Sequence, residues 1–189
     1  MRLKDKVILV TASTRGIGLA VTEACAKEGG IVCMAARDLA RAQEIADQLC
    51  AEGGRVHCIY NDATKPETFL SMVEETVTKA GRIDVLVNNF GTSNPGKDLD
   101  FEHTDPDVFM NTLQLNLRSV FMASQAAAKH MAKQGGGSIV NISSVGGSVP
   151  DISQIAYGTS KLLSLHGRQS VSDILKSMDC DPLPVKFLN

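Results

Sequence analysis

One stretch near the N-terminus, residues 7–18, constrains the fold of this chain more than any other. The aliphatic and β-branched run Val7–Thr11 leads into a turn that carries Gly16 and Gly18, and a helical pattern follows. Glycine has no Cβ, so the backbone and a ligand can approach each other closely there. The free N–H groups and the dipole at a helix start favour an anion such as phosphate. The stretch therefore predicts the nucleotide loop of a doubly wound α/β fold, although an ordinary strand–turn–helix connection has the same outline.

The rest of the chain alternates strand and helix patterns, which favours the nucleotide-binding interpretation. Strands are expected over Lys6–Thr11, Ile31–Ala35, Arg55–Tyr60, Ile83–Asn88 and Ser138–Ile142. Helices are expected over Gly18–Glu28, Leu39–Glu52, Pro66–Ala80 and Pro106–Lys133. Strands that alternate with helices of about ten or more residues indicate parallel βαβ units with right-handed crossovers. The prediction is an α/β fold: a Rossmann-like, doubly wound parallel sheet with helices on both faces.

Composition is that of an ordinary globular protein. The 189 residues fit one domain, and they are 43% apolar and 21% charged, with a formal net charge of −2. There is no basic excess for nucleic acid, no signal-peptide pattern and no apolar run long enough to cross a membrane. The cysteines and histidines have no metal-ligand spacing, so no metal is expected. We therefore expect a cytoplasmic protein that acts on a small molecule, with no nucleic-acid or membrane partner.

Polar residues follow every predicted strand, at the edge where such sheets bind ligands. The polarity of loops in general explains any one of these residues, but it explains five strands in a row poorly. In chain order they are Thr11 and Ser13, Arg37, Asn61 and Asp62, Asn88 and Asn89, and Ser143 and Ser144.

The end of the second strand bears on the choice of nucleotide. An acidic residue there would hydrogen-bond an adenosine ribose and favour NAD. This chain has Ala36 at that place, and Arg37 follows. Arg37 and Arg15 together would offer two guanidinium groups to a 2′-phosphate, unless Arg37 is only a solvated loop residue. NADP(H) is therefore the predicted cofactor, and NAD(H) becomes possible if Asp38 faces the ribose.

Four residues further along the chain have the pattern of carbonyl chemistry. Tyr157 and Lys161 would share one face of a helix, at i and i+4. An ammonium favours the ionised form of a neighbouring phenol, which can then act as general acid or base between a carbonyl and an alcohol. Ser144 can donate a hydrogen bond to the substrate oxygen. Asn116 is a poor helix former in an apolar stretch, which suggests that it binds a water that relays protons to Lys161.

Each of these residues also has a plainer interpretation. Tyr157 and Lys161 alone could be a solvated helix pair, and Asn116 alone could be a surface polar residue. Together with the nucleotide loop, the four residues indicate hydride transfer.

With these residues in place, residues 1–161 of the chain resemble the short-chain dehydrogenase/reductase family. The family's Thr-Gly-x-x-x-Gly-x-Gly loop corresponds to residues 11–18, with Ala12 in place of the first glycine. Its Asn-Asn-Ala-Gly segment corresponds to residues 88–91, with Phe90 in place of alanine. The resemblance implies that Asp62 contacts adenine and that Asn89 lines the cofactor channel. The catalytic set it implies is Asn116, Ser144, Tyr157 and Lys161. The predicted cofactor contacts are Thr11, Ser13, Thr14, Arg15, Gly16, Ile17, Gly18, Arg37, Asp62, Ala63, Asn89, Gly91, Tyr157 and Lys161.

Three segments resemble most closely the bacterial members that act on the 7α-hydroxyl of bile acids. They are residues 11–18, residues 88–95 and residues 149–161. The implied function is an NADP-dependent interconversion of a steroid hydroxyl and its ketone. Two other functions stay open: a reductase of the 3-oxoacyl-carrier-protein type, and a non-catalytic nucleotide-binding remnant.

The resemblance stops after Lys161. Family members continue with a sixth strand, a Pro-Gly turn at the nicotinamide and a seventh strand, and none of these is recognised in residues 162–189. We therefore expect a dinucleotide-binding and catalytic domain over 1–161, a divergent, poorly ordered tail over 162–189, and a sheet without its sixth and seventh strands. A frameshift would produce such a tail, and sequencing the coding DNA tests this hypothesis. Such a chain would bind NADP(H) weakly and turn over slowly or not at all. The tail also replaces part of the surface from which the family builds its homodimers and homotetramers.

Overall fold

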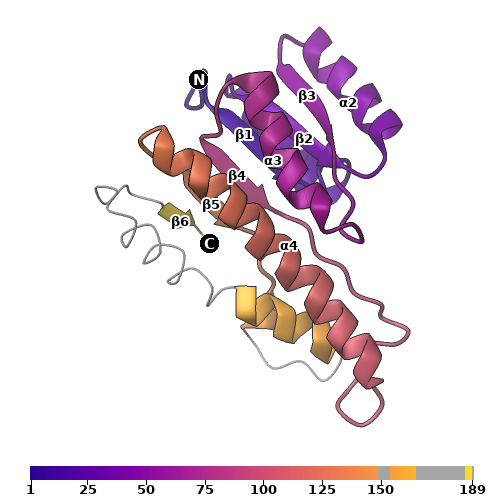
Figure 1. The fold of residues 1–189 in the computed structure, drawn as a ribbon. Coiled ribbons are helices and arrows are strands. Elements are labelled where there is room, and N and C mark those ends of the chain that lie inside the picture. The colour runs from indigo at the N-terminus through magenta and orange to yellow at the C-terminus, as the bar shows by residue number, and fades with distance from the viewer. Residues whose placement is uncertain (149–153, 165–185, 189) are drawn as a thin grey trace.

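The computed structural model describes residues 1–148, 154–164 and 186–188, and it contains a parallel sheet in the order β3-β2-β1-β4-β5-β6 (Figure 1). The strands are β1 (Val7–Thr11), β2 (Ile31–Ala36), β3 (Arg55–Tyr60), β4 (Val85–Asn88), β5 (Ser138–Asn141) and β6 (Lys186–Leu188). The helices are α1 (Gly16–Lys27), α2 (Leu39–Ala51), α3 (Glu67–Ala80) and α4 (Pro106–Lys133), followed by the 3₁₀ turn η1 (Val145–Gly147) and a helix over 155–164. This strand order is that of doubly wound nucleotide-binding folds, so the predicted fold class is confirmed.

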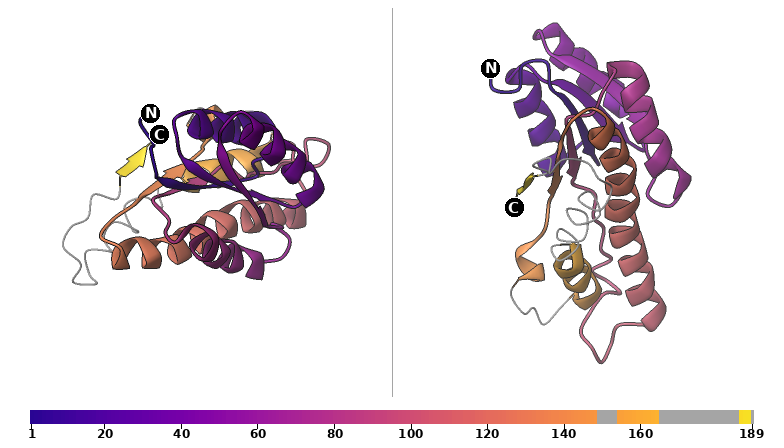
Figure 2. Two further views of the ribbon diagram at one scale, coloured as in Figure 1. Left: turned by 90° about the horizontal axis from the view of Figure 1, so that it is seen from above. Right: turned by 60° about the vertical axis from the view of Figure 1, so that its left-hand side comes forward.

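Helices cover both faces of the sheet (Figure 2), and a cluster of buried apolar side chains lies on each face. Along β1, Ile8 and Val10 face the layer formed by α1 and α2, whereas Val7 and Leu9 face the layer formed by α3 and α4. The strand is buried over its whole length. Because successive strand side chains point to opposite faces, a continuous aliphatic run is the pattern of a strand covered on both sides. The sheet therefore forms a rigid support for the loops at its carboxyl edge.

Helix α4, with 28 residues, is the longest helix in the described part of the chain. Its start is fixed by Asp105, whose carboxylate accepts hydrogen bonds from the N–H groups of Asp107 (2.8 Å) and Val108 (3.4 Å), with Pro106 in the first turn. Both features are common at helix starts. Further along, a run of small residues, Ala126–Ala128, is buried against the sheet. The helix therefore packs closely and places its earlier residues beside the loops that follow the strands.

The structure corrects the expectation of a missing sixth strand. Residues Lys186–Leu188 pair in parallel with β5, with Phe187 in register with Ile139. A bare strand edge offers a row of unpaired N–H and C=O groups, and an extended segment within reach satisfies them. The predicted poor order of the tail concerns residues that mostly lie outside the described part of the chain.

In the part of the chain that the structure describes, no helix combines the length and the apolarity that crossing a bilayer requires. The same residues contain no cluster of His, Cys, Asp and Glu side chains placed to hold a metal ion.

Candidate active site

The glycine loop after β1 has the backbone geometry of a phosphate-binding turn. Arg15 is the N-cap of α1, and Gly16 directly after it has a φ of 54°. A Cβ on Gly16 would meet nothing within 4 Å, so this side of the turn is open to a ligand. Ala12 also has a positive φ, 51°, at the place where the resemblance leads one to expect glycine. The loop thus adopts a left-handed step with alanine, a conformation that costs an L-residue roughly 1–2 kcal/mol.

Gly18 is required for a different reason, a close approach within the protein. A Cβ built there lies 2.3 Å from the carbonyl oxygen of Ala12 and 2.6 Å from Nδ2 of Asn89. The Nδ2 group of Asn89 donates to the carbonyl oxygens of Thr11 and Ala12, at 3.2 Å each. The turn, the start of α1 and the loop after β4 are therefore packed together at Gly18.

Changing Gly18 to alanine is expected to destabilise the protein by about 2 kcal/mol, because the new methyl group meets backbone atoms that cannot move aside. The same displacement opens the phosphate turn, so dinucleotide affinity falls as well. Thermal unfolding and a dinucleotide titration measure the two effects. The control is Gly96→Ala, where a Cβ meets only the Asn94 Oδ1 at 3.7 Å. Equal behaviour of the two variants would contradict this account of the loop.

Three of the predicted cofactor contacts use their side chains to hold the loops in place. The Thr11 Oγ1 accepts from the N–H groups of Asn89 and Phe90, at 3.0 Å each, and the hydroxyl is buried. The Ser13 hydroxyl donates to the carbonyl oxygen of Ala35 at 3.2 Å. Asn89 makes the contacts described above. These side chains hold the loops together. That the three residues contact the cofactor stays a prediction, which rests on their place in the loops after β1 and β4.

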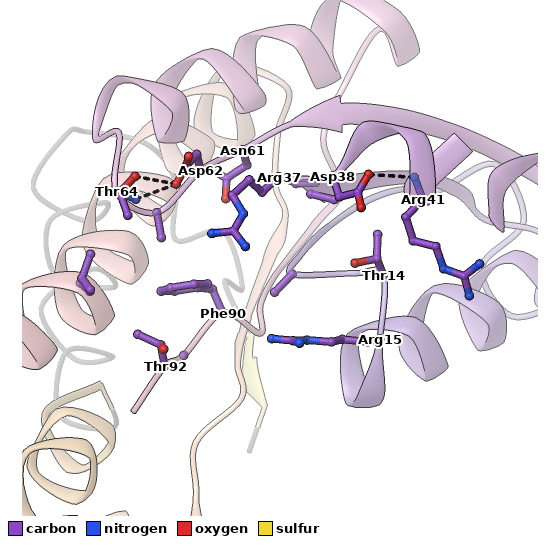
Figure 3. A pocket seen from close by; sticks show the side chains of 16 residues that line it. Thr14, Arg15, Arg37, Asp38, Arg41, Asn61, Asp62, Thr64, Phe90 and Thr92 are labelled. Carbon is purple, nitrogen blue, oxygen red and sulfur yellow. Dashed lines mark hydrogen bonds between the residues drawn. The ribbon is translucent and has the colours of Figure 1, made fainter. Parts of the chain in front are cut away.

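A cleft of about 700 Å³ opens beyond the carboxyl ends of β1, β2 and β3 (Figure 3). Its lining includes six of the predicted cofactor contacts, namely Thr14, Arg15, Arg37, Asp62, Ala63 and Gly91. Figure 3 shows Arg15 and Arg37 reaching into the cleft from two different loops, with the ring of Phe90 beside them. Ile17 is 60% exposed in the adjoining turn. The walls thus combine cationic groups with an apolar ring, and this suits a phosphorylated nucleotide.

Asp62 presents an ionised carboxylate at the rim of this cleft. Its Oδ1 accepts hydrogen bonds from the backbone N–H (3.0 Å) and the hydroxyl (2.8 Å) of Thr64. These bonds stabilise the charged form and lower the pKa of Asp62 below its usual value. A carboxylate held in this way can accept a further hydrogen bond from an exocyclic amine such as that of adenine.

Asp38, the residue that would favour NAD, acts as the N-cap of α2. Its carboxylate accepts a hydrogen bond from the N–H of Arg41 at 3.0 Å. Asp and Asn are favoured at this position because they satisfy a helix N–H that has no partner inside the helix. The side chain still lines the cleft, but one of its oxygens is committed to the helix.

Tyr157 and Lys161 lie together on the helix over 155–164. The Lys161 Nζ lies 5.7 Å from the centre of the Tyr157 ring and donates to the carbonyl oxygen of Ile142 at 3.0 Å. The lysine side chain is only 4% exposed, and this burial lowers its pKa. A Cβ on Gly91 would lie 2.6 Å from that Nζ, so the ammonium touches the wall of the cleft. The ammonium thus lies against the ring of Tyr157, as the i and i+4 spacing predicts, and its action on the phenol oxygen stays a prediction.

The segment after β5 packs directly on this helix. The Ser143 hydroxyl donates to the carbonyl oxygen of Lys161 at 3.2 Å. A Cβ on Gly147 would lie 2.8 Å from the backbone nitrogen of Leu162, and one on Gly158 would lie 2.8 Å from the carbonyl oxygen of Gly146. Ser144 lies within this segment, and its Oγ accepts from the N–H of Gly146 at 3.3 Å. The predicted catalytic serine is therefore next to the predicted catalytic helix.

Asn116 is buried, with 1% exposure, and joins three elements. Its Oδ1 accepts from the N–H of Thr92 at 2.9 Å, while its Nδ2 donates to the Thr92 carbonyl oxygen and to the Ser160 Oγ, both at 2.9 Å. The interpretation as a surface polar residue is thus wrong. The role in a water relay stays a prediction, and the contacts give Asn116 an additional role in docking the helix of Tyr157 against α4.

Sequence reasoning missed Thr92, Ser160 and Asp98. The first two complete the Asn116 contacts, and the Ser160 hydroxyl also donates to the carbonyl oxygen of Tyr157 at 2.7 Å. Asp98 accepts hydrogen bonds from the first N–H groups of the helix that carries Tyr157. No local pattern marks these residues, because their contacts with Asn116 or with the start of the Tyr157 helix join positions that are distant in sequence.

Known proteins match this chain over most of its length. The model of the family described as short chain dehydrogenase matches residues 6–171. A 7alpha-hydroxysteroid dehydrogenase of Clostridium sardiniense is 49% identical over 160 residues, which cover 85% of this chain and 61% of the relative. A 3-oxoacyl-[acyl-carrier-protein] reductase of Thermotoga maritima is 39% identical over 165 residues, with 85% and 64% covered.

Solved structures agree with these matches. The crystal structure of a short chain dehydrogenase from Mycobacterium smegmatis superposes with a TM-score of 0.88 at 31% identity, covering 98% of this chain and 76% of that one. The chain spans about three fifths of the length of the hydroxysteroid dehydrogenases that it matches. The loop, the cleft, the Tyr157–Lys161 pair and these matches agree, and the chain belongs to the short-chain dehydrogenase family.

Proposed function

We propose that this chain is an NADP-dependent oxidoreductase that interconverts a steroid hydroxyl group, the 7α-hydroxyl of a bile acid, and the corresponding ketone. The observation that carries the substrate class is the 49% identity to a protein named for that activity. The reaction type is supported by the buried lysine beside Tyr157 at the edge of the cleft. We also propose that residues 1–161 form the dinucleotide-binding and catalytic domain, and that residues 162–189 form a divergent tail.

The proposed chemistry assigns one task to each catalytic side chain. A bound nicotinamide dinucleotide supplies or accepts the hydride. Tyr157 gives a proton to the carbonyl oxygen in reduction and takes it from the hydroxyl in oxidation. The Lys161 ammonium stabilises negative charge on the phenol oxygen, and the Ser144 hydroxyl donates a hydrogen bond to the reacting oxygen. Asn116 keeps the helix of Tyr157 and Lys161 against α4.

Burial makes Lys161 suited to this task. In the described residues no carboxylate forms an ion pair with its ammonium. Its pKa is lowered because burial disfavours the charge. An ammonium without an anionic partner is stabilised most when a negative charge develops on a neighbouring oxygen. The Tyr157 phenolate would supply that charge.

The preference for NADP(H) rests on Arg15 and Arg37. Both side chains line the cleft, and guanidinium groups form forked, charge-assisted bonds to phosphate. Asp38 has one oxygen committed to α2, which weakens the argument for NAD(H). That the cofactor is a nicotinamide dinucleotide follows from membership of the family.

Changing Arg37 to serine is expected to weaken NADP⁺ binding by about tenfold or more and to leave NAD⁺ binding within about twofold, because only the 2′-phosphate loses a partner. The matched control is Arg41→Ser. Arg41 lines the same cleft, but its guanidinium pairs with Glu44 at 2.9 Å. Titrations of both dinucleotides give the comparison. Equal losses for NADP⁺ and NAD⁺ in Arg37→Ser would contradict the assignment.

The experiment that tests the function follows NADP⁺ reduction with bile acids that carry a 7α-hydroxyl, beside epimers with the 7β-hydroxyl. NADPH formation with the 7α compounds only, and its loss in Tyr157→Phe, is the expected result. The second candidate is a 3-oxoacyl-carrier-protein reductase, favoured by the 39% identity to such a protein. NADPH oxidation with 3-oxoacyl thioesters and no reaction with bile acids would establish that alternative. Dinucleotide binding without turnover on either class would indicate a non-catalytic nucleotide-binding protein.

A further inference from the structure

The helix that carries Tyr157 begins on hydrogen bonds from a distant loop. Gln154, directly before it, has a φ of 54°. The N–H of Ile155 donates to the Leu99 carbonyl oxygen at 3.2 Å. The N–H groups of Ala156 and Tyr157 donate to Oδ1 and Oδ2 of Asp98, at 2.8 and 2.9 Å. The first N–H groups of a helix have no partner inside it, and here two neighbouring residues of the loop before α4 satisfy three of them.

Asp98 is held firmly in this position. The residue is fully buried, with 0% exposure. Its own N–H donates to the Asn94 carbonyl oxygen at 2.7 Å, and the next N–H, that of Leu99, donates to the Thr104 Oγ1 at 2.8 Å. In the described residues no Lys, Arg or His forms an ion pair with Asp98. The carboxylate is therefore stabilised by the helix N–H groups and the positive end of the helix dipole.

The same loop also forms part of the cofactor cleft. Gly91 and Thr92 line the cleft, and both touch the catalytic set: Gly91 lies against the Lys161 Nζ, and Thr92 exchanges two hydrogen bonds with Asn116. Asp98 is the other point where this loop holds the catalytic helix. The loop thus forms part of the cleft wall at Gly91 and Thr92, and it holds the start of the Tyr157 helix at Asp98.

We infer that Asp98 is a positioning residue: it acts through the backbone N–H of Tyr157 and sets the place of the phenol relative to the cleft. The inference rests on the proposed function for its kinetic consequence, but its structural consequence can be measured without a substrate. A carboxylate with two oxygens is suited to the task, because each oxygen holds one of two successive N–H groups and together they fix the rotation of the helix as well as its position.

The test compares Asp98→Ala, Asp98→Asn and a matched control, Asp100→Asn. Asp100 lies in the same loop and also accepts N–H hydrogen bonds, from Glu102 at 3.0 Å and His103 at 2.9 Å, but it is exposed. For Asp98→Ala we expect kcat to fall about a hundredfold and KM for NADP⁺ to stay within about twofold, since small misplacements of a reacting group have effects of that size. Asp98→Asn keeps one acceptor and is expected to lose about tenfold. Asp100→Asn is expected to match the parent.

A second readout needs no turnover. The chain has two tyrosines and no tryptophan, so tyrosine dominates its long-wavelength near-ultraviolet circular dichroism, and the difference from Tyr157→Phe isolates the Tyr157 band. We expect Asp98→Ala to reduce this band and to speed amide hydrogen exchange at Tyr157, with partial recovery in Asp98→Asn. If Asp98→Ala does not fold, the same measurements on Asp98→Asn decide.

An unchanged band and unchanged exchange in a folded Asp98 variant would overturn the inference, whatever the kinetics. Equal losses in kcat and in dinucleotide affinity would also overturn it, because they would mean general destabilisation. A parent that binds dinucleotide but turns over no substrate would instead contradict the proposed function, and the spectroscopic result for Asp98 would still stand.

Discussion

Tyr157→Phe is expected to lower turnover by about a thousandfold while leaving dinucleotide affinity unchanged, because the substitution removes the proton donor and keeps the ring. Loss of a group that acts only while the reaction proceeds appears in kcat and in kcat/KM alike. Steady-state rates with the preferred substrate and a titration with NADPH separate the two quantities. A variant that retains a tenth of the parent rate would show that another group, such as a water held by Ser144, transfers the proton.

The matched control is Tyr60→Phe. Tyr60 and Lys65 form a second phenol–ammonium pair with the same 5.7 Å between Nζ and the ring centre. The surroundings are opposite: Lys65 is exposed, and its hydrogen bond to the Tyr60 hydroxyl at 3.3 Å raises its pKa, whereas burial lowers that of Lys161. We expect Tyr60→Phe to leave turnover nearly unchanged. The two tyrosines share the same distance to an ammonium, so a difference between the variants would point to the burial of Lys161, and not to that distance, as the source of activity.

Lys161→Met is expected to lower turnover by about a hundredfold or more and to raise the melting temperature at neutral pH. Burial lowers the pKa of Lys161 in the folded state below its ordinary value of 10.5. The folded state therefore binds this proton less tightly than the unfolded state does, and the charged lysine destabilises the fold at neutral pH. An apolar side chain of similar length removes that cost. Such a gain of stability with loss of activity is common at catalytic positions.

The pH dependence gives this prediction a sharper test. Below the folded-state pKa the lysine is charged in both states, and the cost of burying the charge is present in full. As pH rises through that pKa towards 10.5 the cost declines, because the folded protein has already released the proton. The advantage of Lys161→Met over the parent should thus shrink with rising pH. Lys65→Met, the exposed counterpart, should not raise the melting temperature at any pH. An increase equal to that of Lys161→Met would contradict burial of the charge as the cause.

Regular patterning made most of the fold predictable. The strand over Arg55–Tyr60 and the helix over Pro106–Lys133 have the expected bounds, because period-two and period-3.6 patterns and an Asp-Pro start are local signals. Tyr157 and Lys161 were found in the same way, since four residues of helix fix their relation. Each of these inferences depends only on residues that are close in sequence.

The contacts that fix the orientation of the site could not be predicted in this way. By sequence alone Asp98 is one more polar loop residue. Its role depends on the contact with Ala156, which lies 58 residues later in the chain. The strand β6 was missed for a related reason: a three-residue strand has too little pattern of its own, and the exposed edge of β5 determines where it pairs. In both cases the structure depends on a second segment, the Tyr157 helix for Asp98 and β5 for β6, that is distant in sequence.

The contact between Gly91 and Lys161 would link cofactor binding with the proposed proton transfer. A Cβ at Gly91 would lie only 2.6 Å from the ammonium, so this wall of the cleft and the lysine are in direct contact. A dinucleotide that binds against Gly91 is therefore expected to restrict the movement of the Lys161 side chain as well. We therefore expect occupancy of the cleft and the position of the ammonium to depend on each other.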